Sequence, residues 1–280
     1  MNETASSLDR IDPVWIRLRD EAQELAAHEP ALSGFVHAVV LNRGRLEEAV
    51  ATHLAEKLAN GEMGARTLCE AFEAAYAADS DIGAAMRADI VAIHERDPAC
   101  RSYLEAVLHY KGFLALEAYR AAHWLIENDR RGMALYVQNR VSETFQVDIH
   151  PAARIGRGVF IDHATGLVIG ETAVVGDDVS LFHGVTIGGS GKNAGDRHPK
   201  IGNGVLLSTG ATVLGNLRIG DCAKVGAGSV VLTDIPAYTT AVGVPAKVIG
   251  GVSSPTPSRQ MDHSVDIVSG DTPPFIGEGI

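Results

Sequence analysis

The sequence predicts an α+β protein, with an all-helical N-terminal domain followed by a left-handed parallel β-helix of hexapeptide repeats. Apolar residues recur at helical spacing in the first half, whereas a period of six replaces that spacing in the second half. The glycine content rises at the same place: seven of the 30 glycines lie in residues 1–154 and 20 lie in residues 155–251. We therefore expect a helical domain over 1–147, a β-helix over 148–251 and a flexible tail over 252–280.

The helical half is divided by its apolar stripes and by helix-ending residues. One stripe runs from Leu46 to Leu58, and others predict helices after Ser80, after Ser102 and over 133–145. Stripes of this kind are typical of a helical core, so we assign them no chemistry.

Twelve hexads share one register in the second half. The position that repeats is aliphatic or small, at Ile155, Ile161, Leu167, Ala173, Val179, Val185, Ile201, Leu207, Val213, Ile219, Val225 and Val231. Three hexads complete one triangular coil, so twelve predict about four coils with the apolar residues inside. Ten additional residues, 191–200, interrupt the register and predict a loop that carries Asp196, Arg197, His198 and Lys200. Such loops often carry function, although composition alone favours a functional loop no more than a solvated one.

Composition excludes several classes of protein. The formal net charge is −11, from 24 Lys and Arg against 35 Asp and Glu, which argues against nucleic-acid binding. No run of about 18 apolar residues predicts a membrane span. The three cysteines, Cys69, Cys100 and Cys222, are widely spaced and odd in number. They favour reduced thiols in the cytoplasm over a disulfide framework.

Polar residues that could carry chemistry gather near the start of the β-helix. Asp148, His150, Asp162 and His163 lie there, and a histidine beside a carboxylate can act as a general base. A polar corner on the surface of the β-helix explains Asp162 and His163 equally well. We predict no metal site, because His163, His183 and His198 contain no closely spaced pair. The glycines at 188, 189 and 191 precede no helix, which argues against a phosphate loop.

Several strings resemble bacterial serine O-acetyltransferases, which belong to the hexapeptide-repeat acyltransferase superfamily. The most specific are DIHPA, DHATG, GGSGK and GDRHPK in the second half, with HERDPAC and YKGFLALEAYRAAHWL upstream. The resemblance covers roughly residues 12–251 and the last residue. It implies transfer of acetyl from acetyl-CoA to the hydroxyl of L-serine, giving O-acetyl-L-serine and CoA in the first step of L-cysteine biosynthesis. Acetyl-CoA is then a co-substrate, no cofactor is permanently bound, and L-cysteine is a feedback inhibitor.

The resemblance also implies roles for individual residues. It makes His163 the general base, Asp148 its carboxylate partner and His198 a second active-site histidine. It pairs Arg197 with the carboxylate of serine and places Asp97 and Asp162 on its amino group. For CoA it implies contacts with small residues and basic side chains, at Gly189, Gly210, Ala211, Lys224, Ala227 and Lys247.

The resemblance extends to partners. It implies a trimer with acetyl-CoA between subunits, and two trimers paired through the helical domains. It implies docking of the terminal Ile280 into O-acetylserine sulfhydrylase. Three alternatives remain open from the residues: an acetyltransferase for another small hydroxyl substrate, a zinc-dependent β-helix lyase, and a structural β-helix without activity.

Overall fold

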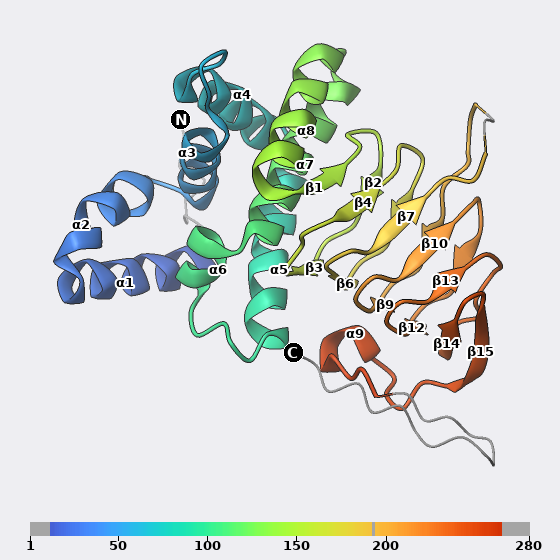
Figure 1. Cartoon of the computed structure of the whole chain (residues 1–280). Coiled ribbons are helices and arrows are strands. Elements are labelled where there is room, and N and C mark those ends of the chain that lie inside the picture. The colour runs from blue at the N-terminus through green and yellow to red at the C-terminus, as the bar shows by residue number, and fades with distance from the viewer. Residues whose placement is uncertain (1–11, 192–193, 265–280) are drawn as a thin grey trace, which may run out of the picture.

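A computed structural model describes residues 12–191 and 194–264 and shows helices followed by a stack of short strands (Figure 1). The helices are α1 (Pro13–His28), α2 (Pro30–Val36), the π-helical turn η1 (His37–Leu41), α3 (Leu46–Leu58), α4 (Ala65–Ala78), α5 (Ser80–Arg96), α6 (Tyr103–His109), α7 (Lys111–Glu127), α8 (Arg131–Phe145) and α9 (Pro257–Gln260). The strands are β1 (Val147–Ile149), β2 (Arg154–Ile155), β3 (Phe160–Asp162), β4 (Leu167–Ile169), β5 (Val174–Val175), β6 (Ser180–Phe182), β7 (Thr186–Gly188), β8 (Lys200–Ile201), β9 (Leu206–Leu207), β10 (Thr212–Leu214), β11 (Arg218–Ile219), β12 (Lys224–Val225), β13 (Val230–Val231), β14 (Thr239–Gly243) and β15 (Ala246–Gly251).

Short polar side chains start several of the helices. Asp79 rather than Ser80 caps α5, because its carboxylate accepts from the backbone N–H of Asp81. Ser102, near which the sequence predicts a helix to begin, caps α6 by accepting from the N–H of Glu105 at 3.1 Å. The stripe that starts there is not one helix, since Tyr110 takes an extended conformation (φ −84°, ψ 102°) between α6 and α7.

The strands form the predicted β-helix. They lie in three sheets, ordered β1-β4-β7-β10-β13, β2-β5-β8-β11 and β3-β6-β9-β12-β14-β15, so that consecutive strands from β1 to β13 pass from one sheet to the next. All pairs are parallel except β14 with β15. Every repeating apolar position of the hexads is buried except Ile155, which is half-buried. The prediction that the repeating apolar residues stack inside the β-helix is thus confirmed.

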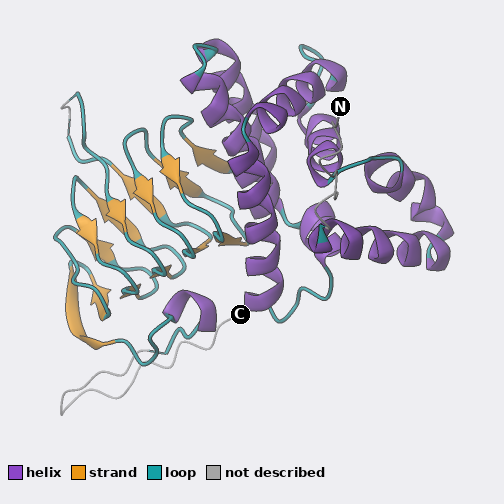
Figure 2. Ribbon diagram, turned by 180° about the vertical axis from the view of Figure 1, so that it is seen from behind, coloured by secondary structure: helices purple, strands orange, loops and turns teal. Residues whose placement is uncertain are grey.

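The helical domain covers one end of the β-helix, where α5 and α7 pack against β3 (Figure 2). Gly112 permits this close approach, because a Cβ there would lie 2.1 Å from the carbonyl oxygen of Ile161. Asp89 accepts the N–H of Val159 at 2.7 Å, and Arg120 donates to the carbonyl of Gly156 at 2.8 Å. These side chains complete hydrogen bonds at the first coil, where a strand has no neighbour on one side.

The first part of the C-terminal segment is packed, so the expectation of a flexible tail is wrong for residues 252–264. The carbonyl of Ser258 in α9 accepts from Ser180 Oγ at 2.8 Å, and Arg259 pairs with Asp178 at 3.0 Å. Ile280 lies outside the described residues. No helix in the described part of the chain is long and apolar enough to cross a membrane.

Candidate active site

The residues that could carry chemistry lie at two corners of the β-helix, one at each end of the strands of the five-stranded sheet. We call each of these corners an edge. His163 is in the turn that joins β3 to β4, which we call the His163 edge. His198 is in the connection from β7 to β8, which we call the His198 edge. Because β4 and β7 belong to this sheet while β3 and β8 belong to the other two, the histidines stand at its opposite edges within one chain.

His163 projects into solvent, with 69% of its side chain exposed. Its backbone is in the left-handed region (φ 53°), which the turn imposes on a non-glycine residue. Asp162 Oδ1 lies 3.9 Å from its Nε2, and the ring of His183 from the next coil lies edge-on at a centroid distance of 5.8 Å. The imidazole is therefore accessible to a substrate, while the turn holds the His163 backbone in place.

Two carboxylates from distant parts of the chain meet beside His163. Asp97 caps the C-terminus of α5, and Asp162 ends β3. Burial raises the pKa of Asp162, and the negative charge of Asp97 contributes to the same rise, which places the two groups within electrostatic reach. Among the described residues, no lysine or arginine forms an ion pair with either carboxylate. The arrangement suits an ammonium group supplied by a ligand.

The start of α7 contacts both Asp97 and the His163 turn. Tyr110 donates its hydroxyl to Asp97 Oδ2 at 2.8 Å, and Lys111 donates to the hydroxyl of Thr165 in the His163 turn. With Gly112 packed against Ile161, three consecutive residues connect the helical domain to the turn. Sequence reasoning missed the roles of Tyr110 and Lys111, although both begin the family string YKGFLALEAYRAAHWL, because the string does not indicate what these side chains contact.

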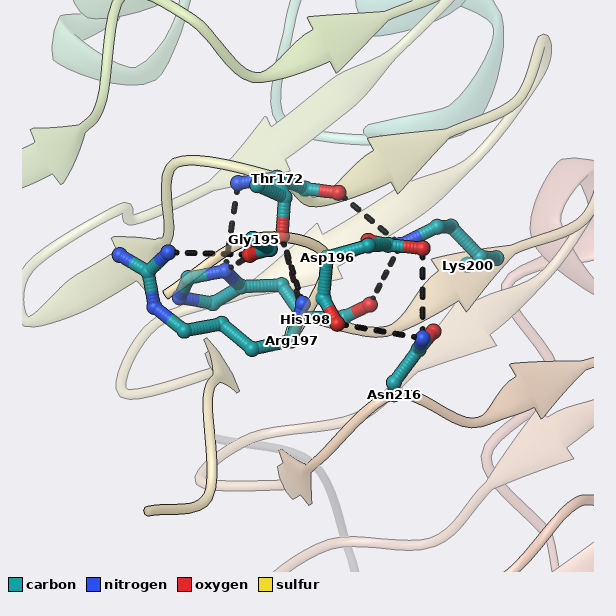
Figure 3. A network of polar contacts seen from close by, with 7 residues as sticks. All are labelled: Thr172, Gly195, Asp196, Arg197, His198, Lys200 and Asn216. Atoms are coloured by element: carbon teal, nitrogen blue, oxygen red, sulfur yellow. Dashed lines mark hydrogen bonds and ion pairs between the residues drawn. The ribbon is translucent and has the colours of Figure 1, made fainter. Parts of the chain in front are cut away.

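At the opposite edge, Thr172 fixes His198 (Figure 3). The backbone N–H of Thr172 points at His198 Nδ1 (3.2 Å), so that nitrogen accepts and the ring proton is assigned to Nε2. The Thr172 hydroxyl lies 2.9 Å from Nδ1 and accepts from the backbone N–H of His198. Burial lowers the pKa of His198, which favours the neutral ring. Gly170 makes room, since a Cβ there would lie 2.0 Å from Nε2.

Arg197 is held beside His198 by a carboxylate. Its Nη2 donates to Glu171 Oε2 at 2.7 Å, and this bond lowers the pKa of Glu171. The loop itself is held by Lys200, which donates to Asp196 Oδ1 and to the carbonyl of Thr172 (Figure 3). Glu171 and Thr172 were not predicted, although a coil of about 18 residues places their corner one layer from the loop.

Asp148 is not hydrogen-bonded to His163 within the described part of one chain. It lies on β1, between buried neighbours, and accepts from Gln138 Nε2 at 2.7 Å. Strand alternation directs it away from the core, onto the outer face of the sheet that separates the two edges. The predicted pairing of Asp148 with His163 therefore has no contact to support it in a single chain.

The residues expected to contact CoA do not form one site in the single chain. Gly210 and Ala227 lie in turns below His163, and the N–H of Gly210 donates to the carbonyl of His183 at 3.0 Å. Ala211, next to Gly210, is buried, and Gly189 belongs to the His198 edge. The basic residues are elsewhere: Lys224 is buried and donates to the carbonyl of Asp262 at 3.0 Å, whereas Lys247 on β15 is exposed.

Within residues 12–191 and 194–264, no group of three His, Cys, Asp or Glu side chains is arranged to hold a metal ion.

Comparison with known proteins identifies the family. A model described as serine acetyltransferase, N-terminal, matches residues 14–118, and one described as bacterial transferase hexapeptide (six repeats) matches residues 198–233. Serine acetyltransferase of Salmonella typhimurium is 51% identical over 255 residues, covering 91% of this chain and 93% of that protein. The Escherichia coli K12 enzyme is 50% identical over 257 residues, covering 92% and 94%. The chain belongs to the serine acetyltransferase family.

Solved structures of serine acetyltransferases agree with this assignment. The Brucella abortus enzyme in complex with coenzyme A has a TM-score of 0.86 at 48% identity, covering 89% of this chain and 99% of that one. A complex with cysteine has a TM-score of 0.89 at 46% identity, covering 90% and 98%. The soybean enzyme with serine has a TM-score of 0.82 at 51% identity, covering 84% and 97%.

Proposed function

We propose that the protein is a serine O-acetyltransferase, which transfers acetyl from acetyl-CoA to the hydroxyl of L-serine in the first step of L-cysteine biosynthesis. The observation that carries this proposal is the acidic pair Asp97 and Asp162 beside the exposed His163, in a chain of this family. Serine offers an ammonium group for the pair and a hydroxyl for the histidine. The relatives solved with coenzyme A and with serine support acetyl-CoA and L-serine as the substrates.

In the proposed mechanism His163 is the general base. Its imidazole takes the proton of the serine hydroxyl while that oxygen attacks the acetyl carbonyl carbon of acetyl-CoA. The tetrahedral intermediate collapses with cleavage of the C–S bond, and the imidazolium returns the proton to the CoA sulfur. His198, neutral with its proton on Nε2, is suited to donate a hydrogen bond to the carbonyl oxygen as negative charge develops there. Asp148 stabilises the imidazolium in the assembled site.

Substrate recognition divides the zwitterion between opposite charges. Asp97 and Asp162 bind the ammonium group, and Arg197 binds the carboxylate. The Arg197 guanidinium donates from Nη2 to Glu171 and from Nη1 to the carbonyl of Gly195, which fixes its direction and leaves its remaining N–H groups for the substrate. L-cysteine, which carries the same ammonium and carboxylate, competes at this site as a feedback inhibitor, and the relative solved with cysteine supports this.

The two edges must come from different subunits to form one site. His163 and His198 lie at opposite edges of a sheet in one chain, so a neighbouring copy has to bring its His198 edge to the His163 edge. A trimer with cyclic symmetry creates three such sites, with CoA lying between subunits along the small residues Gly210 and Ala227. Pairing of helical domains makes the trimer a hexamer.

A thiol-release assay with acetyl-CoA and L-serine tests the activity directly. Release of CoA that requires L-serine is expected, whereas equal or faster release with another hydroxyl compound, such as a sugar, would favour the alternative acetyltransferase. Analysis of the purified protein for zinc tests the lyase alternative in the same preparation.

Subunit complementation tests the shared site. His163→Ala and His198→Ala chains, each inactive alone, are co-expressed with different tags and purified as mixed trimers. One site in a mixed trimer then receives both native histidines, so about one third of the wild-type activity is expected. A mixed trimer as inactive as its parents would show that both histidines of a site come from one chain.

We also propose that Ile280 mediates a complex with O-acetylserine sulfhydrylase. A terminal apolar side chain with a free carboxylate can enter a site built for a small amino acid. A peptide of the last ten residues should bind the sulfhydrylase, and deletion of Ile280 should abolish binding of the whole enzyme without reducing acetyl transfer. Binding that survives the deletion would reject this partner. We propose that the enzyme is cytoplasmic, which is consistent with this partner and with acetyl-CoA and L-serine as substrates.

A further inference from the structure

Tyr110 occupies the break between α6 and α7, directly behind the proposed ammonium site. Its hydroxyl donates to Asp97 Oδ2 at 2.8 Å, and the other carboxylate oxygen of Asp97 accepts the backbone N–H of Ala99 at 2.8 Å. Each oxygen thus receives one donor from the protein and keeps a lone pair. The rotation of the Asp97 carboxylate is fixed by two hydrogen bonds from opposite sides.

The position of Tyr110 is itself fixed by its neighbours. Ser102 caps α6 on one side, and the residues that follow, Lys111 and Gly112, contact Thr165 and Ile161 on the other. The extended conformation of Tyr110 between two helices directs its side chain out of either helix and toward the end of α5. Tyr110 is half-buried there.

The phenol is a donor at neutral pH. Burial raises the pKa of Tyr110, and the hydrogen bond to Asp97 raises it further, so the hydroxyl keeps its proton. Asp97 needs such a donor, because a carboxylate at the C-terminus of a helix meets the negative end of the helix dipole. Asp162 adds a second negative charge nearby.

We propose that Tyr110 is a positioning residue that keeps the Asp97 carboxylate oriented toward the ammonium group of L-serine. Tyr110 acts through Asp97 and takes no part in acetyl transfer. The inference rests on the proposed function, since it assumes that Asp97 binds the substrate ammonium. It predicts a selective effect on L-serine, because acetyl-CoA has no ammonium group.

Steady-state kinetics of Tyr110→Phe test the inference. Loss of a hydrogen bond to a charged group should raise KM for L-serine about 10-fold, with kcat changed less than about two-fold. The dissociation constant of acetyl-CoA should stay within about two-fold of wild type by calorimetry. Tyr136→Phe is the matched control, since its hydroxyl contacts Asn60 at 3.1 Å in the helical domain, and it should match wild type.

A double-mutant cycle separates this inference from the proposed function. Asp97→Ala alone should lower kcat/KM for L-serine strongly; a near-normal value would reject Asp97 as the ammonium site. In the Asp97→Ala background, Tyr110→Phe should cause no further loss. A full additional loss there, an unchanged KM in the single variant, or equal weakening of L-serine and acetyl-CoA would overturn the role of Tyr110.

Discussion

Two acidic pairs lie where the helical domain meets the β-helix, and they differ in how their charge is balanced. The buried acidic pair, Asp89 and Glu117, lies between α5 and α7 with both side chains fully buried. The open acidic pair, Asp97 and Asp162, lies at the end of α5 beside His163. The first pair contains its own cation, and the second has no lysine or arginine in ion-pair contact among the described residues.

Arg120 supplies the cation of the buried pair. Its Nη2 lies 2.5 Å from Asp89 Oδ2, and its Nε lies 3.6 Å from Glu117 Oε1. Burial raises the pKa of Glu117, which favours the protonated form of this side chain. One ionised carboxylate then faces one guanidinium, and the cluster is neutral.

The comparison shows how position decides the use of similar groups. Carboxylates without access to water must be neutralised by the chain itself, because an unpaired buried charge is too costly. Carboxylates at an exposed corner can remain charged, because water solvates them until a ligand binds. The same helix, α5, carries one member of each pair, so a structural cluster and a binding site share one scaffold.

The largest effect is expected beside the open pair, at His163. His163→Ala should lower kcat by about 10²–10⁴-fold, which is the usual contribution of a positioned general base. Asp148→Asn should cost less, because the imidazole remains. Both are measured by CoA release at saturating substrates. A His163→Ala variant with near-normal turnover would show that His163, beside the open pair, is not the general base.

The next effect concerns stability at the buried pair. Arg120→Met should destabilise the protein by about 3–5 kcal/mol, because it leaves Asp89 buried without its cation. Denaturant unfolding measures this loss, and the KM for L-serine of the folded fraction should stay near wild type. A raised KM without lost stability would show that the two pairs are not separate in function.

A smaller effect distinguishes the pairs by substrate binding. Asp162→Asn should raise KM for L-serine about 10-fold with little change in melting temperature, since the removed charge faces an ammonium group. In the wild type, the raised pKa of Asp162 means that this carboxylate is protonated at a higher pH than an ordinary aspartate. KM for L-serine should therefore rise as the pH falls toward this pKa, and the Asn variant should lose that part of the dependence.

The smallest effect is expected for Glu117→Gln. Because the folded pKa of Glu117 is raised above its unfolded value, its contribution to stability is present below the unfolded pKa and is lost as pH rises through the folded pKa. Gln resembles the protonated side chain, so stability at pH 5, near the unfolded pKa, should change by less than about 1 kcal/mol. Melting temperatures from pH 5 to pH 8 should fall less steeply in this variant. A large loss at every pH would mean that Glu117 is ionised.

Much of the fold could be predicted because its signals are periodic. The hexads from Ile155 to Val231 predict the β-helix, since every coil repeats the same inward position, and the structure buries all but the first. The family strings indicated His163, His198 and Arg197, and the structure places each at an edge of one sheet. The role of each residue in catalysis stays a prediction.

What only the tertiary structure decided depends on contacts between distant residues. Nothing local in the sequence joins Asp97 to Asp162 or to Tyr110, because these contacts depend on how α5 and α7 dock on the first coil. The packing of residues 252–264 could not be predicted from the sequence either. Their polar composition predicts exposure, and it does not indicate the contact of Ser258 with Ser180. Asp148 shows the reverse: the strings pair it with His163, but within one chain its carboxylate accepts from Gln138 and no hydrogen bond joins it to His163 among the described residues. A repeat determines its own core by local stacking, whereas a site is assembled by the packing of surfaces that the repeat does not encode.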